Sequence, residues 1–227
     1  MSGTALLLAM ALGATQVESM RYLALGDSYT IGESVAAEQR WPVQLSAGLR
    51  ELGLAVADPD IVARTGWTTD ELDRAIDAAV EAGEVSGEYQ LVSLLIGVNN
   101  QYRGRSVESH LPEFEALLQR AIGYAGGKPQ RVIVLSIPDW GVTPFAAAQK
   151  RDAAEVARSI DAYNAAQRAV CARLGVAWID ITPGTREASA RPELLAADGL
   201  HPSGIDYARW AAKALPVARQ ALQSGDR

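Results

Sequence analysis

Five apolar runs of strand length recur along this chain, and they restrict its fold more than any other feature. The runs cover residues 22–25, 54–56 with 61–63, 91–96, 132–137 and 176–181. Each is almost continuously apolar and does not alternate with polar residues, which is typical of strands covered on both faces. The sequence therefore predicts a sheet that is buried between two layers.

Helical patterns separate these runs. One pattern places apolar side chains at spacings of three and four: Val107, Leu111, Phe114, Leu118 and Ile122. A second helix is expected over residues 156–174, and no Asn-Gly or Asp-Gly hairpin turn joins two of the runs. Alternating strands and helices imply crossover connections, so the predicted fold is a three-layer α/β/α sandwich around a five-stranded parallel sheet.

Length and charge narrow the function classes. A chain of 227 residues suits one buried domain, which we expect over residues 20–227. The net charge of -6 and the lack of a basic stripe argue against nucleic acid as a partner. Cys171 is the single cysteine, so the chain has no disulfide framework and no cysteine-based metal site. Its place in a helical apolar pattern predicts a core residue.

The N-terminal segment, residues 1–19, allows two interpretations. Its apolar stretch over residues 5–14 has the length of a signal peptide and is too short to span a bilayer, so no stable membrane anchor is expected. No basic residue precedes that stretch, which favours an upstream extension and a cytoplasmic protein. If the segment is a weak signal, the protein is secreted or periplasmic. The sequence leaves both interpretations open.

Polar clusters follow the predicted strands and do not precede them. They occupy residues 26–28, 64–67, 97–100, 138–140 and 198–201. In an open parallel sheet, ligands bind beyond the carboxyl ends of the strands. We therefore expect these five segments to meet at one edge of the sheet and to form the functional site.

Ser28, Asp198 and His201 are the candidate catalytic residues. A serine hydroxyl becomes a useful nucleophile only when a base within hydrogen-bond reach takes its proton. The chain has two histidines, and His110 is expected to be an exposed helix residue whose replacement by alanine leaves activity nearly unchanged. His201 lies in a polar loop three residues after Asp198, which is placed to accept the imidazole N–H and orient the ring.

These clusters resemble the SGNH, or GDSL, family of serine esterases and lipases, which is defined by four ordered blocks. The matching residues are Gly26-Asp27-Ser28, Gly66, Gly97-x-Asn99 and Asp198-x-x-His201. The blocks occur in the family's order and span the chain from residue 22 to about residue 205. A lone Gly-Asp-Ser is a weak signal, whereas four ordered blocks after four strands are a specific one.

The resemblance implies a flavodoxin-like fold and a hydrolase of carboxylic esters that works through an acyl-enzyme. It implies Ser28 as nucleophile, with an oxyanion hole formed by the Ser28 and Gly66 backbone N–H groups and the Asn99 amide. It implies a small acyl ester as substrate, with no cofactor and no metal. One departure stands out, because Asn100 occupies the position where the family usually has aspartate.

The sequence does not distinguish among several substrate classes. Short-chain esters, acetylated sugars, thioesters and lysophospholipids all occur in the family, and a non-catalytic flavodoxin-like binding module is the alternative of another class. Four side chains beside the motifs are candidates for the substrate pocket, although packing around loop ends explains them equally well: Trp67, Tyr102, Arg103 and Trp140. The sequence does not indicate acyl-chain length or oligomeric state.

Overall fold

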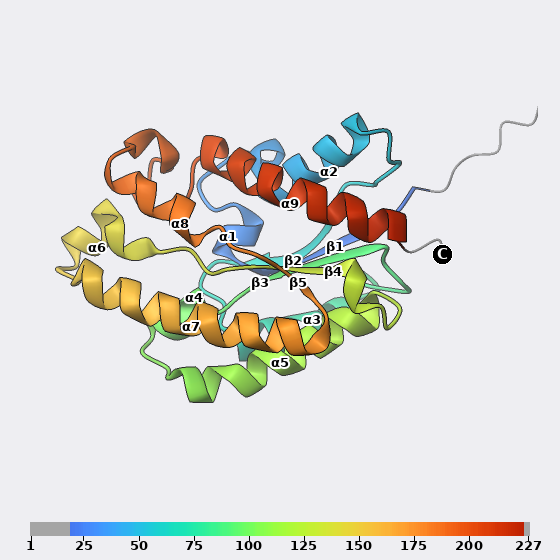
Figure 1. Ribbon diagram of the computed structural model, residues 1–227, viewed down its shortest axis with the longest axis horizontal. Coiled ribbons are helices and arrows are strands. Elements are labelled where there is room, and N and C mark those ends of the chain that lie inside the picture. The colour runs from blue at the N-terminus through green and yellow to red at the C-terminus, as the bar shows by residue number, and fades with distance from the viewer. Residues whose placement is uncertain (1–18, 225–227) are drawn as a thin grey trace, which may run out of the picture.

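The structure, a computed structural model, describes residues 19–224 and contains one five-stranded parallel sheet (Figure 1). The strands are β1 (Tyr22–Asp27), β2 (Asp60–Arg64), β3 (Leu91–Leu95), β4 (Val132–Leu135) and β5 (Ala177–Ile179). Their order in the sheet is β2-β1-β3-β4-β5, with every neighbouring pair parallel. This is the flavodoxin-like order, as the family resemblance implied.

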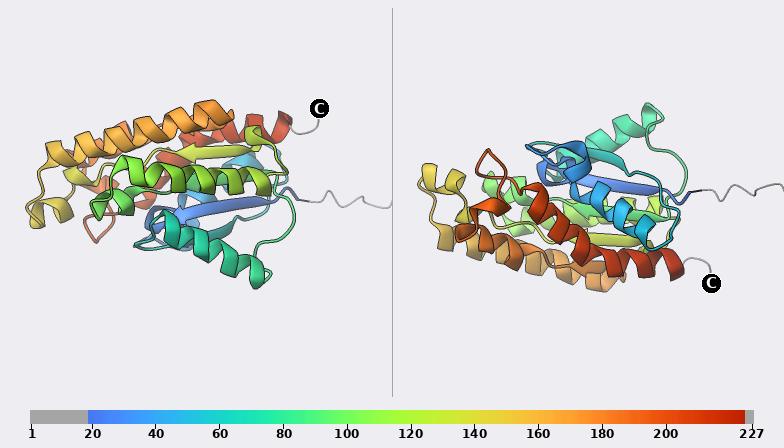
Figure 2. Two further views of the ribbon diagram at one scale, coloured as in Figure 1. Left: turned by 90° about the horizontal axis from the view of Figure 1, so that it is seen from below. Right: turned by 90° about the horizontal axis from the view of Figure 1, so that it is seen from above.

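Helices cover both faces of the sheet. Those above it in Figure 1 are α2 (Trp41–Glu51) and α9 (Gly204–Ser224). Those below it are α3 (Thr69–Glu81), α5 (Val107–Tyr124) and α7 (Ala153–Leu174). The views from above and below in Figure 2 show the same division. The predicted three-layer sandwich is therefore confirmed.

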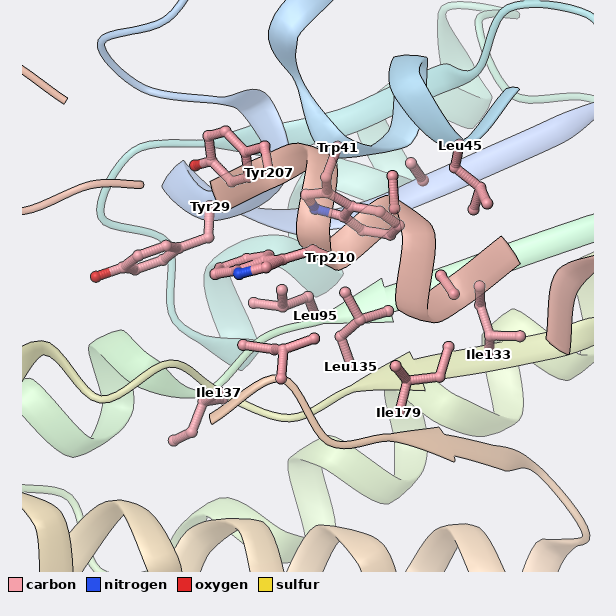
Figure 3. Close-up of a cluster of buried hydrophobic side chains, with 14 of the residues drawn as sticks. Tyr29, Trp41, Leu45, Leu95, Ile133, Leu135, Ile137, Ile179, Tyr207 and Trp210 are labelled. Carbon is pink, nitrogen blue, oxygen red and sulfur yellow. The ribbon is translucent and has the colours of Figure 1, made fainter. Parts of the chain in front are cut away.

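Two apolar cores fill the space between the layers. The core on the α2 and α9 side includes Trp41, Leu45 and Trp210, which Figure 3 shows packed over the side chains of Leu95 and Leu135. The other core lies between the sheet and helices α3, α5 and α7. It includes Cys171, which is fully buried as predicted. Because both faces of each central strand are covered, the strands read as continuous apolar runs.

The sequence order of the strands reverses between β1 and β3, which creates a topological switch point. Short helices begin where these two strands end: α1 (Ser28–Ile31) after β1 and α4 (Val98–Tyr102) after β3. Two more short helices, α6 (Pro144–Ala148) and α8 (Thr182–Thr185), follow β4 and β5. The functional site is expected at this end of the sheet.

The second strand is shorter than the sequence predicted. Residues 54–56 are not part of the second strand, because Val56 forms only an isolated bridge with Met20 and β2 begins at Asp60. The two interpretations of residues 1–19 concern a segment that lies, up to residue 18, outside the described residues. Within the described part of the chain, no helix combines the length and apolar character needed to cross a bilayer.

Candidate active site

Ser28 is placed at the end of the buried central strand β1. It is the first residue of α1, and it is almost fully buried. The Asp27 carboxylate caps this short helix by accepting a hydrogen bond from the Tyr29 N–H at 3.0 Å. The preceding Gly26 is required by space, because a Cβ there would lie 2.6 Å from the Leu95 carbonyl oxygen. The turn therefore holds the serine on rigid backbone.

His201 is bonded to Asp198 in the arrangement that a general base needs. Its Nδ1 lies 2.6 Å from Asp198 Oδ2. A carboxylate only accepts hydrogen bonds, so Nδ1 carries the proton and Nε2 is left as the basic nitrogen. Burial raises the pKa of Asp198, but hydrogen bonds from His201, from the Leu200 N–H and from Ser34 outweigh it and bring that pKa to about 2. The carboxylate is therefore ionised at neutral pH.

The Tyr29 ring packs against the imidazole of His201, and Trp210 packs against Tyr29 in turn. The Tyr29 ring lies 5.0 Å from the His201 ring and 6.2 Å from the Trp210 ring, centroid to centroid. Figure 3 shows Tyr29 and Trp210 side by side at the edge of the core. Burial raises the pKa of the Tyr29 hydroxyl, with a further contribution from the nearby Asp27 carboxylate, so this ring is neutral and serves as a packing surface.

Gly66 and Asn99 lie at the same cavity as Ser28. Gly66 has a φ of 87°, which favours glycine, and the loop after it is held by a capping box in which the Thr68 N–H donates to Glu71 at 2.9 Å. Asn99 lies in the first turn of α4, where its Nδ2 donates to the Trp67 carbonyl at 3.0 Å. Both groups are thus held in place from outside the cavity.

Asp27 lies directly beneath this arrangement. Its Oδ2 lies 3.5 Å from Asn99 Nδ2, and the side chain is fully buried. Burial raises the pKa of the Asp27 carboxyl to about 7, against the lowering effect of its hydrogen bond from the Tyr29 N–H. The 3.5 Å contact is long for a hydrogen bond, so Asp27 holds the second Asn99 amide hydrogen only weakly.

One cavity of ≈150 Å³ joins the predicted residues. It is lined by Ser28, Gly66, Asn99 and His201, together with Tyr29, Thr65, Val98, Tyr102, Trp140, Phe145 and Leu200. Residues 19–224 contain no hydrogen bond from the Ser28 hydroxyl to His201. Such contacts are often long until substrate binds. Five segments far apart in sequence thus meet at one opening.

The four candidate pocket residues divide into two pairs. Tyr102 and Trp140 line the cavity, with ring centroids 5.2 Å apart in an edge-to-face arrangement. Trp67 and Arg103 are not among the residues that line it. The Trp67 side chain packs against the apolar core beneath α3 and α5. Arg103 donates to the Gly66 carbonyl at 2.7 Å and pairs with Glu71, so it braces the Gly66 loop.

Several residues that line the cavity were not predicted from the sequence. Tyr29, Val98 and Leu200 are each next to a motif residue in the chain, so adjacency to the motifs was a usable signal. Phe145 carried no such signal. It belongs to α6, and the loop after β4 brings it beside Trp140, with ring centroids 6.4 Å apart.

Asn100 has a structural role that its amide explains. Its Oδ1 accepts from the Thr69 N–H at 3.1 Å, and its Nδ2 donates to Thr69 Oγ1 at 2.7 Å. The Thr69 hydroxyl in turn donates to Glu113. An aspartate at this position has no N–H to offer to Thr69 Oγ1, so the amide fits this bonding pattern better. Asn100 thereby ties α4 to the start of α3.

His110 is buried, and the expectation of an exposed helix residue was wrong. Its ring is fully enclosed between α5 and α7, and Nε2 lies 3.0 Å from Gln167 Nε2. The buried face of α5 also contains Phe114, Leu117 and Leu118, and His110 precedes Phe114 by one turn. Burial, and secondarily the Arg105 charge, lower the pKa of His110 to about 4. It does not line the Ser28 cavity.

Comparisons with known proteins agree with this fold. Similar solved structures include a lipolytic protein of the G-D-S-L family from Veillonella parvula, with 21% identity, a TM-score of 0.64, and coverage of 88% of this chain and 98% of that one. An acetylxylan esterase, Axe2, from Geobacillus stearothermophilus has 18% identity, a TM-score of 0.62, and coverage of 88% and 94%.

The esterase EstA from Pseudoalteromonas, in a structure inhibited by monoethylphosphonate, has 16% identity, a TM-score of 0.59, and coverage of 92% and 97%. At these identities the likeness shows the fold. A comparison with curated protein sequences gives no match. The sequence model of the GDSL-like lipase/acylhydrolase family, however, matches residues 24–209, which is most of the chain. The chain belongs to the GDSL-like lipase/acylhydrolase family.

Proposed function

We propose that this protein hydrolyses short-chain carboxylic esters through an acyl-enzyme formed on Ser28. The observation that carries the proposal is the single cavity shared by Ser28, Gly66, Asn99 and His201, with Asp198 bonded to the far side of the His201 ring. The chain belongs to a family of lipases and acylhydrolases, and this membership supports ester hydrolysis in general.

The proposed reaction has two halves. His201 Nε2 takes the proton of the Ser28 hydroxyl as the oxygen attacks the ester carbonyl, and it returns that proton to the leaving alcohol. A water molecule then attacks the acyl-enzyme with the same histidine as base. The ionised Asp198 stabilises the imidazolium that forms in each half.

In the proposed reaction, three donors stabilise the tetrahedral intermediates. These are the backbone N–H groups of Ser28 and Gly66 and the side-chain amide of Asn99, whose second hydrogen is bonded only weakly to Asp27. Donors held in place before reaction cost no rearrangement when the oxyanion forms, and one such donor is typically worth about 10²–10³ in turnover. The bonds that hold Asn99 and the Gly66 loop from outside the cavity supply that pre-organisation.

The cavity favours a small acyl group. Its volume of ≈150 Å³ is below the roughly 300–1,000 Å³ of pockets that accommodate drug-sized ligands. The side chains around it are largely aromatic or aliphatic: Tyr102, Trp140, Phe145 and Leu200. We expect p-nitrophenyl acetate and butyrate to be hydrolysed faster than p-nitrophenyl octanoate. Acetylated xylan and acyl-CoA, tested in the same panel, show which alcohol or thiol portion the enzyme accepts.

Replacement of the nucleophile tests the proposal. Ser28→Ala should lower the hydrolysis of p-nitrophenyl acetate by at least about 10³-fold, and His201→Ala should be comparably damaging, because either change removes the attacking pair. Ser189→Ala is the matched control, since this exposed serine hydroxyl bonds only to the Arg186 carbonyl. Circular dichroism verifies the fold of each variant. Full activity in folded Ser28→Ala would rule out Ser28 as the nucleophile, whereas no hydrolysis by the unmodified protein would favour the non-catalytic binding module.

A further inference from the structure

Ser34 makes a contact with the proposed catalytic acid that none of the four family blocks includes. Its hydroxyl donates to Asp198 Oδ2 at 2.8 Å. The same oxygen lies 2.6 Å from His201 Nδ1, so one carboxylate oxygen serves both groups. The other oxygen, Oδ1, accepts from the backbone N–H groups of Leu200 and His201, each at 2.9 Å.

This distribution of bonds gives Ser34 a distinct task. The two backbone bonds hold Oδ1 and leave the carboxylate able to turn about that point. The Ser34 hydroxyl comes from a different segment of the chain and restrains Oδ2 as well. A carboxylate restrained at both oxygens keeps its lone pair directed at His201 Nδ1, and the imidazole orientation depends on that bond.

The backbone at Ser34 is held in an uncommon conformation. Its φ is 64°, and within residues 19–224 the only other residue besides glycines with a positive φ is Lys150. Left-handed backbone is unfavourable for serine and persists where the surrounding structure imposes it. An outlier of this kind beside a functional group points to a positional requirement for its side chain.

The loop that carries Ser34 is tied to the nucleophile and to the oxyanion loop. The Gly32 and Glu33 N–H groups both donate to the Ser28 carbonyl, the latter at 3.0 Å. The Glu33 carboxylate accepts a hydrogen bond from the hydroxyl of Thr65, the residue before Gly66. Residues 32–34 therefore connect three of the segments that meet at the cavity, those of Ser28, Thr65 and Asp198.

We propose that Ser34 is a positioning residue that sets the orientation of Asp198 toward His201. This inference rests on the proposed function, because it assigns Ser34 a part in the same reaction. Ser34 transfers no proton and does not touch the substrate. Its effect should appear in kcat and leave KM nearly unchanged, because orientation of the base matters in the transition state and substrate binding does not use it.

Two substitutions separate the hydroxyl from the backbone. Ser34→Gly removes the hydroxyl and suits a φ of 64°, so the variant should fold normally. Ser34→Asn restores a side-chain donor in a residue type that tolerates left-handed backbone. With p-nitrophenyl acetate we expect Ser34→Gly to lower kcat by roughly 5- to 20-fold with KM within about twofold, and Ser34→Asn to recover most of that loss.

Lys150→Gly is the matched control, because it makes the same backbone change at the other non-glycine residue with positive φ among those described. Its kcat should equal that of the unmodified protein. A folded Ser34→Gly with unchanged kcat would overturn the positioning role, as would a Ser34→Asn whose kcat is as low as that of Ser34→Gly. If Ser28→Ala is inactive in the same assay, the proposed function stands and the Ser34 inference alone has failed. Full activity in Ser28→Ala would remove both.

Discussion

At the scale of single residues, Phe145 is the side chain whose size we expect to set acyl-chain preference. It is half-buried at the wall of the ≈150 Å³ cavity, next to Tyr102 and Trp140. Phe145→Ala should enlarge the cavity and raise the octanoate-to-acetate ratio of kcat/KM by roughly 10-fold, because each methylene that enters an apolar site contributes about 0.8 kcal/mol. A series of p-nitrophenyl esters measures that ratio.

Trp67→Ala is the control for this prediction. Trp67 is also a large aromatic residue beside a motif glycine, but its side chain packs against the apolar core and does not line the cavity. Its ratio of octanoate to acetate hydrolysis should stay unchanged, whatever its stability. An unchanged ratio in Phe145→Ala, with both variants folded, would show that another wall limits chain length.

The residues in and around the cavity show what the sequence can predict at the scale of single side chains. Ser28, Gly66, Asn99 and His201 meet at one cavity, as expected, because each follows its own strand and backbone topology decides where it lies. Whether a neighbouring side chain points into that cavity depends on side-chain direction and on packing partners. Trp67 and Phe145 could therefore be distinguished only in three dimensions.

At the scale of elements, the contact between α5 and α7 depends on a buried polar pair. His110 lies against Gln167, whose Nε2 also donates to the Ile96 carbonyl at 2.9 Å. His110→Ala should lower the free energy of unfolding by about 2–3 kcal/mol, because it removes packing and leaves Gln167 short of a partner. It should leave kcat within about twofold, since His110 does not line the cavity.

Urea unfolding measures this loss, and Gln119→Ala, an exposed change on the same helix, should be near zero. Equal stability of the two variants would contradict the role of the buried pair. The sequence predicted α5 itself from the spacing of Phe114 and Leu118, because helix periodicity is a strong signal. It could not reveal that His110 shares their face, because the partner of its Nε2, Gln167, lies on another helix and is far away in sequence.

At the scale of the whole molecule, the strand order brings the functional residues together. The order β2-β1-β3-β4-β5 places the ends of β1 and β3 side by side, so Ser28 and Asn99 lie in the first turns of two neighbouring short helices. This arrangement also buries the Asp27 side chain completely, between the end of β1 and α4. The fold therefore carries a buried carboxyl at its functional edge, and the burial has a measurable consequence for global stability.

That consequence is a loss of stability as pH rises. Burial raises the pKa of Asp27 from 3.8 to about 7, so the folded state holds a proton that the unfolded state has released between these values. A raised folded-state pKa gives stability that is complete below the unfolded value and is lost as pH rises through the folded value. Asp27 should therefore destabilise the fold progressively from pH 4 to pH 7, and by a constant amount at higher pH.

Asp27→Asn removes the ionisation and keeps an oxygen for the Tyr29 N–H. Its free energy of unfolding should exceed that of the unmodified protein by roughly 1–3 kcal/mol at pH 8, with a smaller difference at pH 5. Urea unfolding at the two pH values measures both differences. Asp152→Asn is the control, because this exposed helix cap also loses a charge but is not buried. A difference for Asp27→Asn that is the same at pH 5 and pH 8 would mean that the Asp27 carboxyl does not titrate between them, and that its enclosure by β1 and α4 is less complete in solution.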